Sequence, residues 1–168
     1  HNGGYDSLKD KIEIKQVIED SNQSVHVDYP FYLLLSERES KDTNDSSIIS
    51  YFTYDHLTYL FMGDASKQIE KQLMAAYDLK ADVIKVGHHG SNTSSDPDFL
   101  DSLDCKIALI SCGYKNKYGH PSVETLKTLE NLHINTLCTS DCGSIAMYSL
   151  FHFSFVVTND GMFGIIWT

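Results

Sequence analysis

Apolar residues along this chain alternate in some segments and recur every three or four positions in others. The run "IISYFTYDHLTYLFM", residues 48–62, has two β-rich halves and predicts a hairpin. Ser66 is placed to cap a helix with one apolar face, and the strand "DVIKVG" follows at residues 82–87. Helices and strands continue to alternate beyond this point, which is typical of a layered α/β domain. The other predicted elements are a helix at 5–11, a strand at 12–18, a strand within 24–36 broken at Pro30, a helix at 97–103, a strand at 106–111, a helix that begins at Pro121, and strands at 134–140, 144–149, 151–157 and 162–167.

Composition limits the possible classes of protein. The chain has 168 residues, 42% of them hydrophobic, which is enough for one domain with a sizeable core. No apolar run approaches the roughly 20 residues that span a bilayer, so we expect this chain itself to be soluble. Lys and Arg number 13 against 23 Asp and Glu, and the net charge of −10 disfavours sequence-independent binding to phosphate backbones. No cysteines form a CxxC pair, and three of the four lie in or beside apolar segments, so we expect buried free thiols rather than a disulfide or a zinc site: Cys105, Cys112, Cys138 and Cys142.

Residue types that bind metals follow two of the predicted strands. Asp64 comes after the hairpin, and "VIKVGHHGSNTSS", residues 83–95, carries His88 and His89 directly after the next strand. Loops at strand ends build the sites of layered domains, and carboxylate and imidazole are ligands of divalent ions. Simpler interpretations stay open. Asp64 is also consistent with an acidic cap on the following helix, which the helix dipole favours. The paired histidines are also consistent with an ordinary polar loop. His120 in "KYGHPSVETL" is also consistent with a residue that merely precedes a helix.

The order of these motifs resembles that of a known family. "LFMGDAS", then a helical segment, then "ADVIKVGHHGSNTSS" and "ALISCGYKNKYGHPSVETL" are similar to the metallo-β-lactamase-fold domain at the C-terminal end of the ComEC competence proteins, over about Thr43 to Ser149. The resemblance implies an αββα sandwich, with residues 1–168 forming a partial domain that lacks its N-terminal strands. That family carries a His-x-Asp-x-Asp-His-x-Gly-Gly motif. "HNGG" looks like its tail, which makes His1 a metal ligand and puts the other ligands upstream.

The resemblance also implies roles for single residues. Asp64 matches the aspartate that commonly bridges two metals, and His88 or His89 matches the histidine at the end of the next strand, with His88 preferred. The middle histidine of the fold falls near Asn44 and Asp45, and this departure favours a weak site or a harder ion such as Mn²⁺ over Zn²⁺.

The implied catalytic residues are Asp64 and His120, the latter as a general acid or phosphate contact. Ser91, Lys115 and Lys117 are the expected substrate contacts, and Lys85 adds local positive charge.

The implied activity is the hydrolysis of a phosphodiester in DNA by a metal-bound water. The expected partners are single-stranded DNA and the channel portion of a bacterial integral membrane protein, with this domain on the extracytoplasmic face. Two alternatives remain: a non-catalytic DNA- or channel-binding domain with a degenerate metal site, and a small-ester hydrolase acting on a phosphocholine or lactone. We expect the chain alone to be a poor, nearly metal-free catalyst, and its exposed sheet edge favours self-association.

Overall fold

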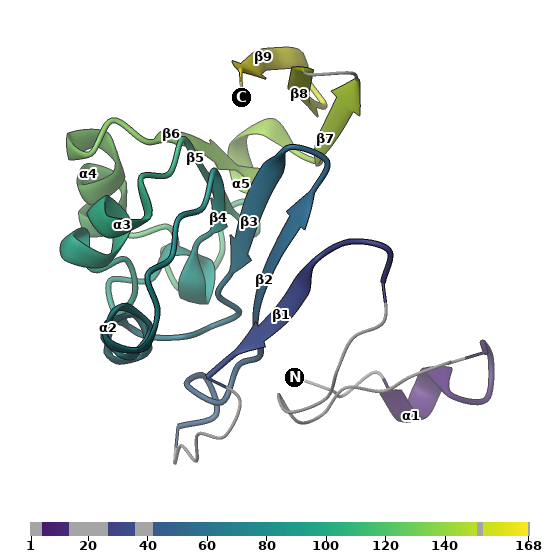
Figure 1. Cartoon of the computed structure of the whole chain (residues 1–168), viewed down its shortest axis with the longest axis horizontal. Coiled ribbons are helices and arrows are strands. Elements are labelled where there is room, and N and C mark those ends of the chain that lie inside the picture. The colour runs from purple at the N-terminus through teal and green to yellow at the C-terminus, as the bar shows by residue number, and fades with distance from the viewer. Residues whose placement is uncertain (1–4, 14–26, 36–41, 151–152, 168) are drawn as a thin grey trace.

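The computed structural model describes residues 5–13, 27–35, 42–150 and 153–167. Within these residues, six strands form one mixed sheet, called sheet A, in the order β1-β2-β3-β4-β5-β6. The first three strands pair antiparallel, and the last three continue the sheet in parallel (Figure 1). The strands are β1 (Phe31–Leu34), β2 (Ile49–Tyr54), β3 (Leu57–Phe61), β4 (Val83–Lys85), β5 (Ile107–Ile110) and β6 (Asn135–Cys138).

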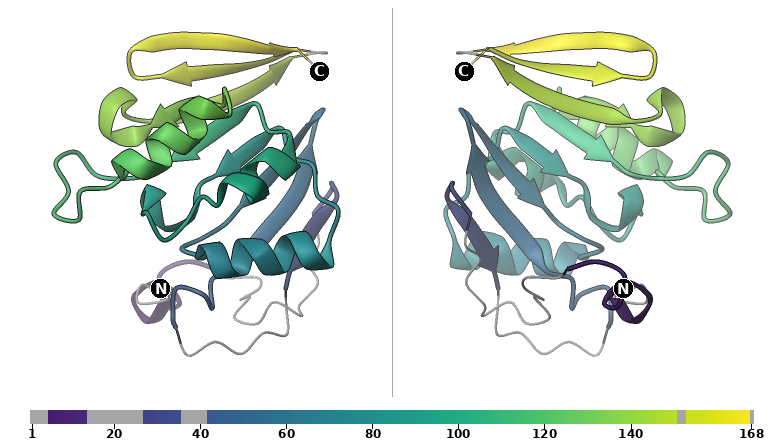
Figure 2. Two further views of the ribbon diagram at one scale, coloured as in Figure 1. Left: turned by 90° about the vertical axis from the view of Figure 1, so that its left-hand side faces the viewer. Right: turned by 90° about the vertical axis from the view of Figure 1, so that its right-hand side faces the viewer.

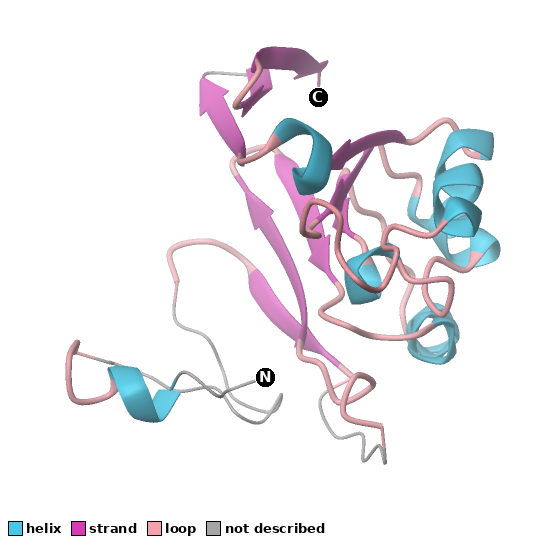
Figure 3. Ribbon diagram, turned by 180° about the vertical axis from the view of Figure 1, so that it is seen from behind, coloured by secondary structure: helices cyan, strands magenta, loops and turns pink. Residues whose placement is uncertain are grey.

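Three helices connect the parallel strands and cover one face of sheet A (Figure 3). Each connection leads to the next strand in the same direction across the sheet. Right-handed crossovers that all run one way place their helices on the same side. None of the helices in the described residues is long and apolar enough to cross a membrane. The connecting helices are α2 (Lys67–Ala76), α3 (Pro97–Leu103) and α4 (Val123–Asn131), and the short helices are α1 (Tyr5–Leu8), the 3₁₀ turn η1 (Gly87–Gly90) and α5 (Thr139–Cys142).

A second sheet, sheet B, lies over the opposite face of sheet A (Figure 2). Its antiparallel strands are β7 (Ile145–Leu150), β8 (Phe153–Thr158) and β9 (Gly161–Trp167). Because side chains alternate along a strand, Val83 of β4 belongs to the apolar cluster that includes Val156 of sheet B, whereas Ile84 belongs to the larger core under the helices. Burial on both faces explains why the run "DVIKVG" is almost continuously apolar.

The predicted α/β class is confirmed, and several elements match in detail. The hairpin at residues 48–62 forms β2 and β3. Ser66 caps α2, since its hydroxyl accepts a hydrogen bond from the backbone N–H of Gln68. The metallo-β-lactamase-like sandwich and the single domain over residues 1–168 stay predictions.

The helix predicted from Pro121 begins two residues later. Ser122 is its N-cap, and Val123 is the first helical residue. The expected apolar face is only partly buried, because Leu129 enters the core whereas Val123 and Leu126 are 68% and 39% exposed. The apolar periodicity of α4 therefore does not mean that every apolar side chain of the helix packs against sheet A.

Two N-terminal predictions also change. The strand expected around Pro30 begins only after it, at Phe31, since proline has no N–H to donate to a ladder. The helix predicted at 5–11 is limited to Tyr5–Leu8. Most of the strand predicted at 12–18 falls outside the described residues.

The four cysteines are free thiols, as predicted, but the predicted burial is complete for only one of them. Cys138 is buried and the other three are partly buried. The sulfur atoms of Cys112 and Cys138, at the ends of β5 and β6, lie 3.1 Å apart. Burial raises the pKa of Cys138 to about 11 and that of Cys105 to about 12, so both thiols are protonated near neutral pH.

Candidate functional site

The candidate site lies where β3, β4 and β5 end. These strands are parallel to one another, so their carboxyl ends meet at one edge of sheet A. Asp64 follows β3, and His88 and His89 follow β4. The segment from Ser111 to His120 follows β5. Loops at this edge of a parallel sheet converge on a common crevice, which is why polar residues there form sites.

Asp64 is held by the segment that precedes β2. Its backbone N–H donates a hydrogen bond to the hydroxyl of Ser47, with the two atoms 2.9 Å apart. Two residues later the N–H of Ser66 donates to the carboxylate of Asp45 at 3.0 Å. Residues 42–47 thus brace the start of α2 and fix the Asp64 backbone beside the sheet edge.

His88 and His89 adopt a backbone conformation that L-residues rarely use. Their φ angles are 46° and 55°, with ψ of 44° and 22°, so two successive residues have left-handed backbone conformations. Such residues cost about 1–3 kcal/mol each and cluster at functional sites. The N–H of His88 donates to the carbonyl of Gly63 at 3.2 Å, which ties the strained turn to the residue before Asp64.

Glycines on either side of the two histidines allow this turn. A Cβ atom on Gly87 would lie 2.6 Å from the carbonyl oxygen of Ala65, and one on Gly90 would lie 2.8 Å from Cβ of Pro121. Gly90 also has a φ of +79°. The two glycines of the Gly-His-His-Gly turn are therefore required, Gly87 by close approach to backbone and Gly90 by close approach to Pro121 and by its positive φ.

His89 faces Asp64 with a defined tautomer. Its Nδ1 lies within hydrogen-bonding distance of the backbone carbonyl of Ser111, and because a carbonyl only accepts, Nδ1 carries the proton. Its Nε2 lies 3.6 Å from Oδ1 of Asp64, whose side chain is largely buried. In the neutral ring this Nε2 is a lone-pair acceptor, so two acceptors face each other across the gap. Such a pair needs a proton or a cation between them.

The spacing of these two atoms fits a shared metal ion. Ligand atoms about 2.1 Å from a tetrahedral ion lie about 3.4 Å apart, close to the 3.6 Å between Asp64 Oδ1 and His89 Nε2. The backbone carbonyl on Nδ1 of His89 is also the usual second contact of a metal-binding histidine. Across residues 5–13, 27–35, 42–150 and 153–167, no three His, Cys, Asp or Glu side chains are grouped closely enough to hold an ion. His1, the further predicted ligand, lies outside the described residues.

His88, the ligand preferred from the sequence, points to a different neighbour. Its ring lies 5.8 Å from that of His120 in an edge-on arrangement, and its Nδ1 lies 3.3 Å from the hydroxyl of Thr93. Burial and the nearby imidazoles of His88 and His89 lower the pKa of His120, so that ring is mainly neutral near pH 7. The structure thus brings together Asp64 with His89 and His88 with His120. Which of these residues bind a metal stays a prediction.

Lys85 adds positive charge beneath the site. Its ammonium group donates to the carbonyl of Gly63 at 2.8 Å. Burial lowers the pKa of Lys85, and the carboxylate of Asp64 opposes this by favouring the charged form. The partly buried ammonium group of Lys85 thus offsets the negative charge of Asp64.

The predicted substrate contacts occupy contrasting environments. Ser91 is buried, and its hydroxyl accepts hydrogen bonds from the hydroxyl and N–H of Thr93, so in this conformation it supports the loop after the histidines. Lys115 and Lys117 lie on the exposed loop of residues 113–119, which stands out from the body of the molecule in Figure 2. Contact of these residues with a substrate stays a prediction.

The loop of residues 113–119, here called the Tyr–Lys loop, is organised by Asn116. The Asn116 amide donates to the carbonyls of Gly113 and His120, and its oxygen accepts from the N–H groups of Tyr118 and His120. The loop is thereby tied to the residue that enters the candidate site.

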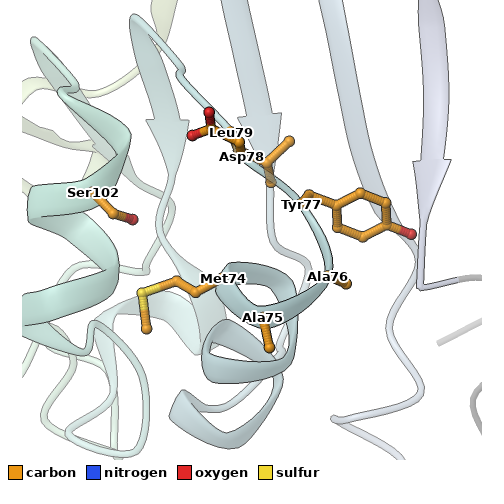
Figure 4. A pocket seen from close by; sticks show the side chains of 7 residues that line it. All are labelled: Met74, Ala75, Ala76, Tyr77, Asp78, Leu79 and Ser102. Atoms are coloured by element: carbon orange, nitrogen blue, oxygen red, sulfur yellow. The ribbon is translucent and has the colours of Figure 1, made fainter.

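A cavity of about 490 Å³ lies away from these histidines, at the C-terminal end of α2 (Figure 4). Asp64 precedes the opposite end of this helix. The cavity holds a single ionisable carboxylate, that of Asp78, and otherwise small or apolar groups and Tyr77. It lacks the converging polar groups of a reactive site.

Sequence reasoning did not single out the residues that position the histidines. The Ser111 carbonyl and Ser47 act through backbone or short-range contacts that leave no pattern in the sequence. Tyr114 and Tyr118 do form a recognisable sequence pattern, because aromatic and basic residues interleave in "GYKNKYG". Such interleaving is a known signal for nucleic-acid contact.

No protein-family model matches the chain. The chain is 35% identical to the ComE operon protein 3 of Bacillus subtilis over 120 residues, which are 70% of this chain and 16% of that protein. It is 33% identical to the Competence protein ComA of Neisseria gonorrhoeae over 126 residues, 74% of this chain and 18% of that protein. Recombination protein 2 of Haemophilus influenzae is 37% identical over 70 residues, 42% of this chain and 9% of that protein. In each case the chain spans less than a fifth of the relative. The chain is thus a homologue of the competence proteins of the ComEC family and aligns with one part of them.

Proposed function

We propose that the chain is a metal-dependent phosphodiesterase of the metallo-β-lactamase fold, acting on single-stranded DNA as part of a competence protein of the membrane. The best support is the pair of acceptors, Asp64 Oδ1 and His89 Nε2, that lie 3.6 Å apart at the carboxyl edge of sheet A. Relatives named for competence support a role in DNA uptake. The arrangement of helices, sheet A and sheet B in three layers is compatible with the proposed fold.

In this proposal Asp64 and His89 hold a divalent ion together with ligands outside the described residues, among them His1. An oxygen and a nitrogen ligand suit both Zn²⁺ and Mn²⁺. An ion held there would supply a water of lowered pKa and positive charge for the phosphate. Ser111 keeps the Nε2 lone pair of His89 directed at the site, because its carbonyl binds the proton on Nδ1.

His120 and Lys85 complete the proposed chemistry. The neutral imidazole of His120 donates a hydrogen bond from its N–H group to a phosphate oxygen and so stabilises the negative charge that develops toward the leaving oxygen. Lys85 stays below the site, where its ammonium group is fixed on Gly63 and offsets the charge of Asp64. These roles place the attacking side at Asp64 and His89 and the leaving side at His120, next to His88.

The direct test is a comparison of two Asp–His pairs. Asp64→Asn and His89→Gln remove the proposed ligands, whereas Asp55→Asn and His56→Gln alter a pair on the β2–β3 turn with Nε2 3.2 Å from the carboxylate. Binding of Mn²⁺ is measured by calorimetry, and hydrolysis by release of nitrophenol from methyl p-nitrophenyl phosphate. We expect at least about tenfold weaker binding for each site variant and no change for the turn variants.

The same assays are run on a version extended upstream through the expected histidine and aspartates. Hydrolysis by the extended version that disappears with Asp64→Asn supports the proposal. Equal losses in the turn variants, or full activity in the Asp64→Asn variant, contradict it, because the catalytic centre would then lie elsewhere.

A non-catalytic DNA-binding domain is the second candidate, and one observation favours it. Asp45 stands where the fold's middle ligand is expected, yet its carboxylate is buried and accepts the N–H of Ser66. At least one carboxylate oxygen of Asp45 is therefore used in a hydrogen bond that supports the fold rather than in binding an ion. The calorimetric titration separates the two functions, because only the enzyme requires Mn²⁺ or Zn²⁺ to bind at Asp64.

A further inference from the structure

We propose that the Tyr–Lys loop is a subsite for single-stranded nucleic acid. The rings of Tyr114 and Tyr118 stack on unpaired bases, and the ammonium groups of Lys115 and Lys117 bind the phosphates between those bases. This inference deepens the proposed function and rests on it for the class of substrate.

The two tyrosine rings are exposed on a loop whose backbone is held in place. Tyr114 and Tyr118 are 74% and 70% exposed, although aromatic rings in folded domains are usually covered. The side chain of Asn116 binds backbone groups on both sides of itself and so fixes the loop that carries them. An ordered loop with uncovered rings loses little entropy when a planar ligand stacks on it.

A lysine ammonium group lies over each tyrosine ring. The Lys115 ammonium lies 5.2 Å from the centre of the Tyr114 ring, and the Lys117 ammonium lies 4.9 Å from the centre of the Tyr118 ring. Base-stacking rings beside phosphate-binding cations are the combination by which proteins bind single strands without reading sequence. In a chain with a net charge of −10, positive charge grouped on one projecting loop provides a local attraction for a polyanion.

The rings also lead toward the candidate site. The ring of Tyr118 stacks on that of His120 with centres 5.9 Å apart and planes 17° apart, and His120 meets His88 at 5.8 Å. A strand whose bases stack along the loop would therefore be directed toward Asp64 and His89. Bases in a duplex already stack on one another, so their faces are not open to tyrosine rings. The loop should thus favour unpaired strands over duplex.

The test measures binding of fluorescein-labelled oligothymidine, and of a duplex of equal length, by fluorescence anisotropy at low salt. The variants are Tyr114→Ala with Tyr118→Ala, the same pair changed to Phe, and a control pair, Tyr32→Ala with Tyr54→Ala, two exposed tyrosines of β1 and β2. We expect the loop alanine variant to bind the single strand at least about tenfold more weakly. The phenylalanine variant and the control variant should bind within about twofold of the wild-type chain, because stacking survives in the first and the loop is intact in the second.

The lysines are tested through the dependence of binding on salt. Lys115→Gln with Lys117→Gln should reduce the slope of log K against log salt by about 1.4 if both ammonium groups contact phosphates. Equal affinity of the wild-type chain for duplex and single strand, or unchanged binding by the loop alanine variant, overturns the inference.

Failure of the proposed function is recognised separately. Hydrolysis of methyl p-nitrophenyl phosphate, a substrate without a nucleobase, by the upstream-extended version and by its Asp64→Asn variant tests the metal site alone. Tyrosine-dependent binding of oligothymidine without any such hydrolysis would refute the enzyme and retain the subsite. Hydrolysis together with binding of oligothymidine that does not depend on the tyrosines would support the enzyme and refute the subsite.

Discussion

Glu70 of α2 offers the sharpest test of the energetics around the site, because opposing effects act on one buried carboxyl group. Its two oxygens accept hydrogen bonds from the N–H groups of Ser95 and Asp96 at 2.8 and 2.7 Å, which anchors the end of the loop that follows the histidines. These bonds favour the charged carboxylate. Burial, together with the charge of Asp96, favours the neutral acid and prevails, raising the pKa of Glu70 from 4.5 to about 7.

The sign of the pH dependence follows from this raised pKa. Between pH 4.5 and about 7 the folded chain holds a proton on Glu70 that the unfolded chain has released. The stability that Glu70 contributes is therefore full below pH 4.5 and is lost as the pH rises through about 7. At about 1.4 kcal/mol for each pH unit between the two values, the whole change is about 3 kcal/mol, and most of it falls between pH 5 and 8.

The measurement is the free energy of unfolding in urea at pH 5, 6, 7 and 8 for the wild-type chain and for Glu70→Gln, which cannot titrate. We expect the wild-type chain to lose about 2–3 kcal/mol relative to the variant across this range. Glu130→Gln, which removes an exposed carboxylate from α4, is the control and should follow the wild-type curve. A constant difference between wild type and Glu70→Gln, or a rise in relative wild-type stability with pH, would show that the two N–H donors outweigh burial.

Three further outcomes are expected. Gly87→Ala should lower the free energy of unfolding by about 1–3 kcal/mol, since its Cβ would lie 2.6 Å from the Ala65 carbonyl oxygen, and denaturation in urea that matches the wild type would refute the close approach. Asn116→Ala removes the four hydrogen bonds that order residues 113–119, so trypsin should cleave there at least several-fold faster while the thermal midpoint changes by only a few degrees; an unchanged rate of cleavage would mean that other contacts order the loop. Cys105, whose pKa burial raises to about 12, should react with iodoacetamide at pH 8 at least about tenfold more slowly in the folded chain than in urea, as followed by peptide mass spectrometry, and equal rates would contradict its protection.

Local patterns were sufficient to predict most of the secondary structure and the positions at which chemistry is concentrated. The β2–β3 hairpin and the Ser66 cap of α2 depend on residues that are near one another in the chain, so alternation and capping preferences report them directly. The placement of Asp64 and the paired histidines at strand ends follows from the same pattern, because polar residues interrupt apolar runs where strands leave the core.

Contacts between distant residues decided the rest. The sequence cannot distinguish His88 from His89, and their orientation depends on two left-handed residues and on the Ser111 carbonyl of a different strand end. Burial of Glu70, a charged residue of α2, depends on two N–H groups that the fold brings from the loop after β4. Solvent exposure of the Tyr118 ring likewise depends on the projection of its loop from sheet A. Each of these features arises from packing between segments that are far apart in the chain, and no local periodicity encodes such packing.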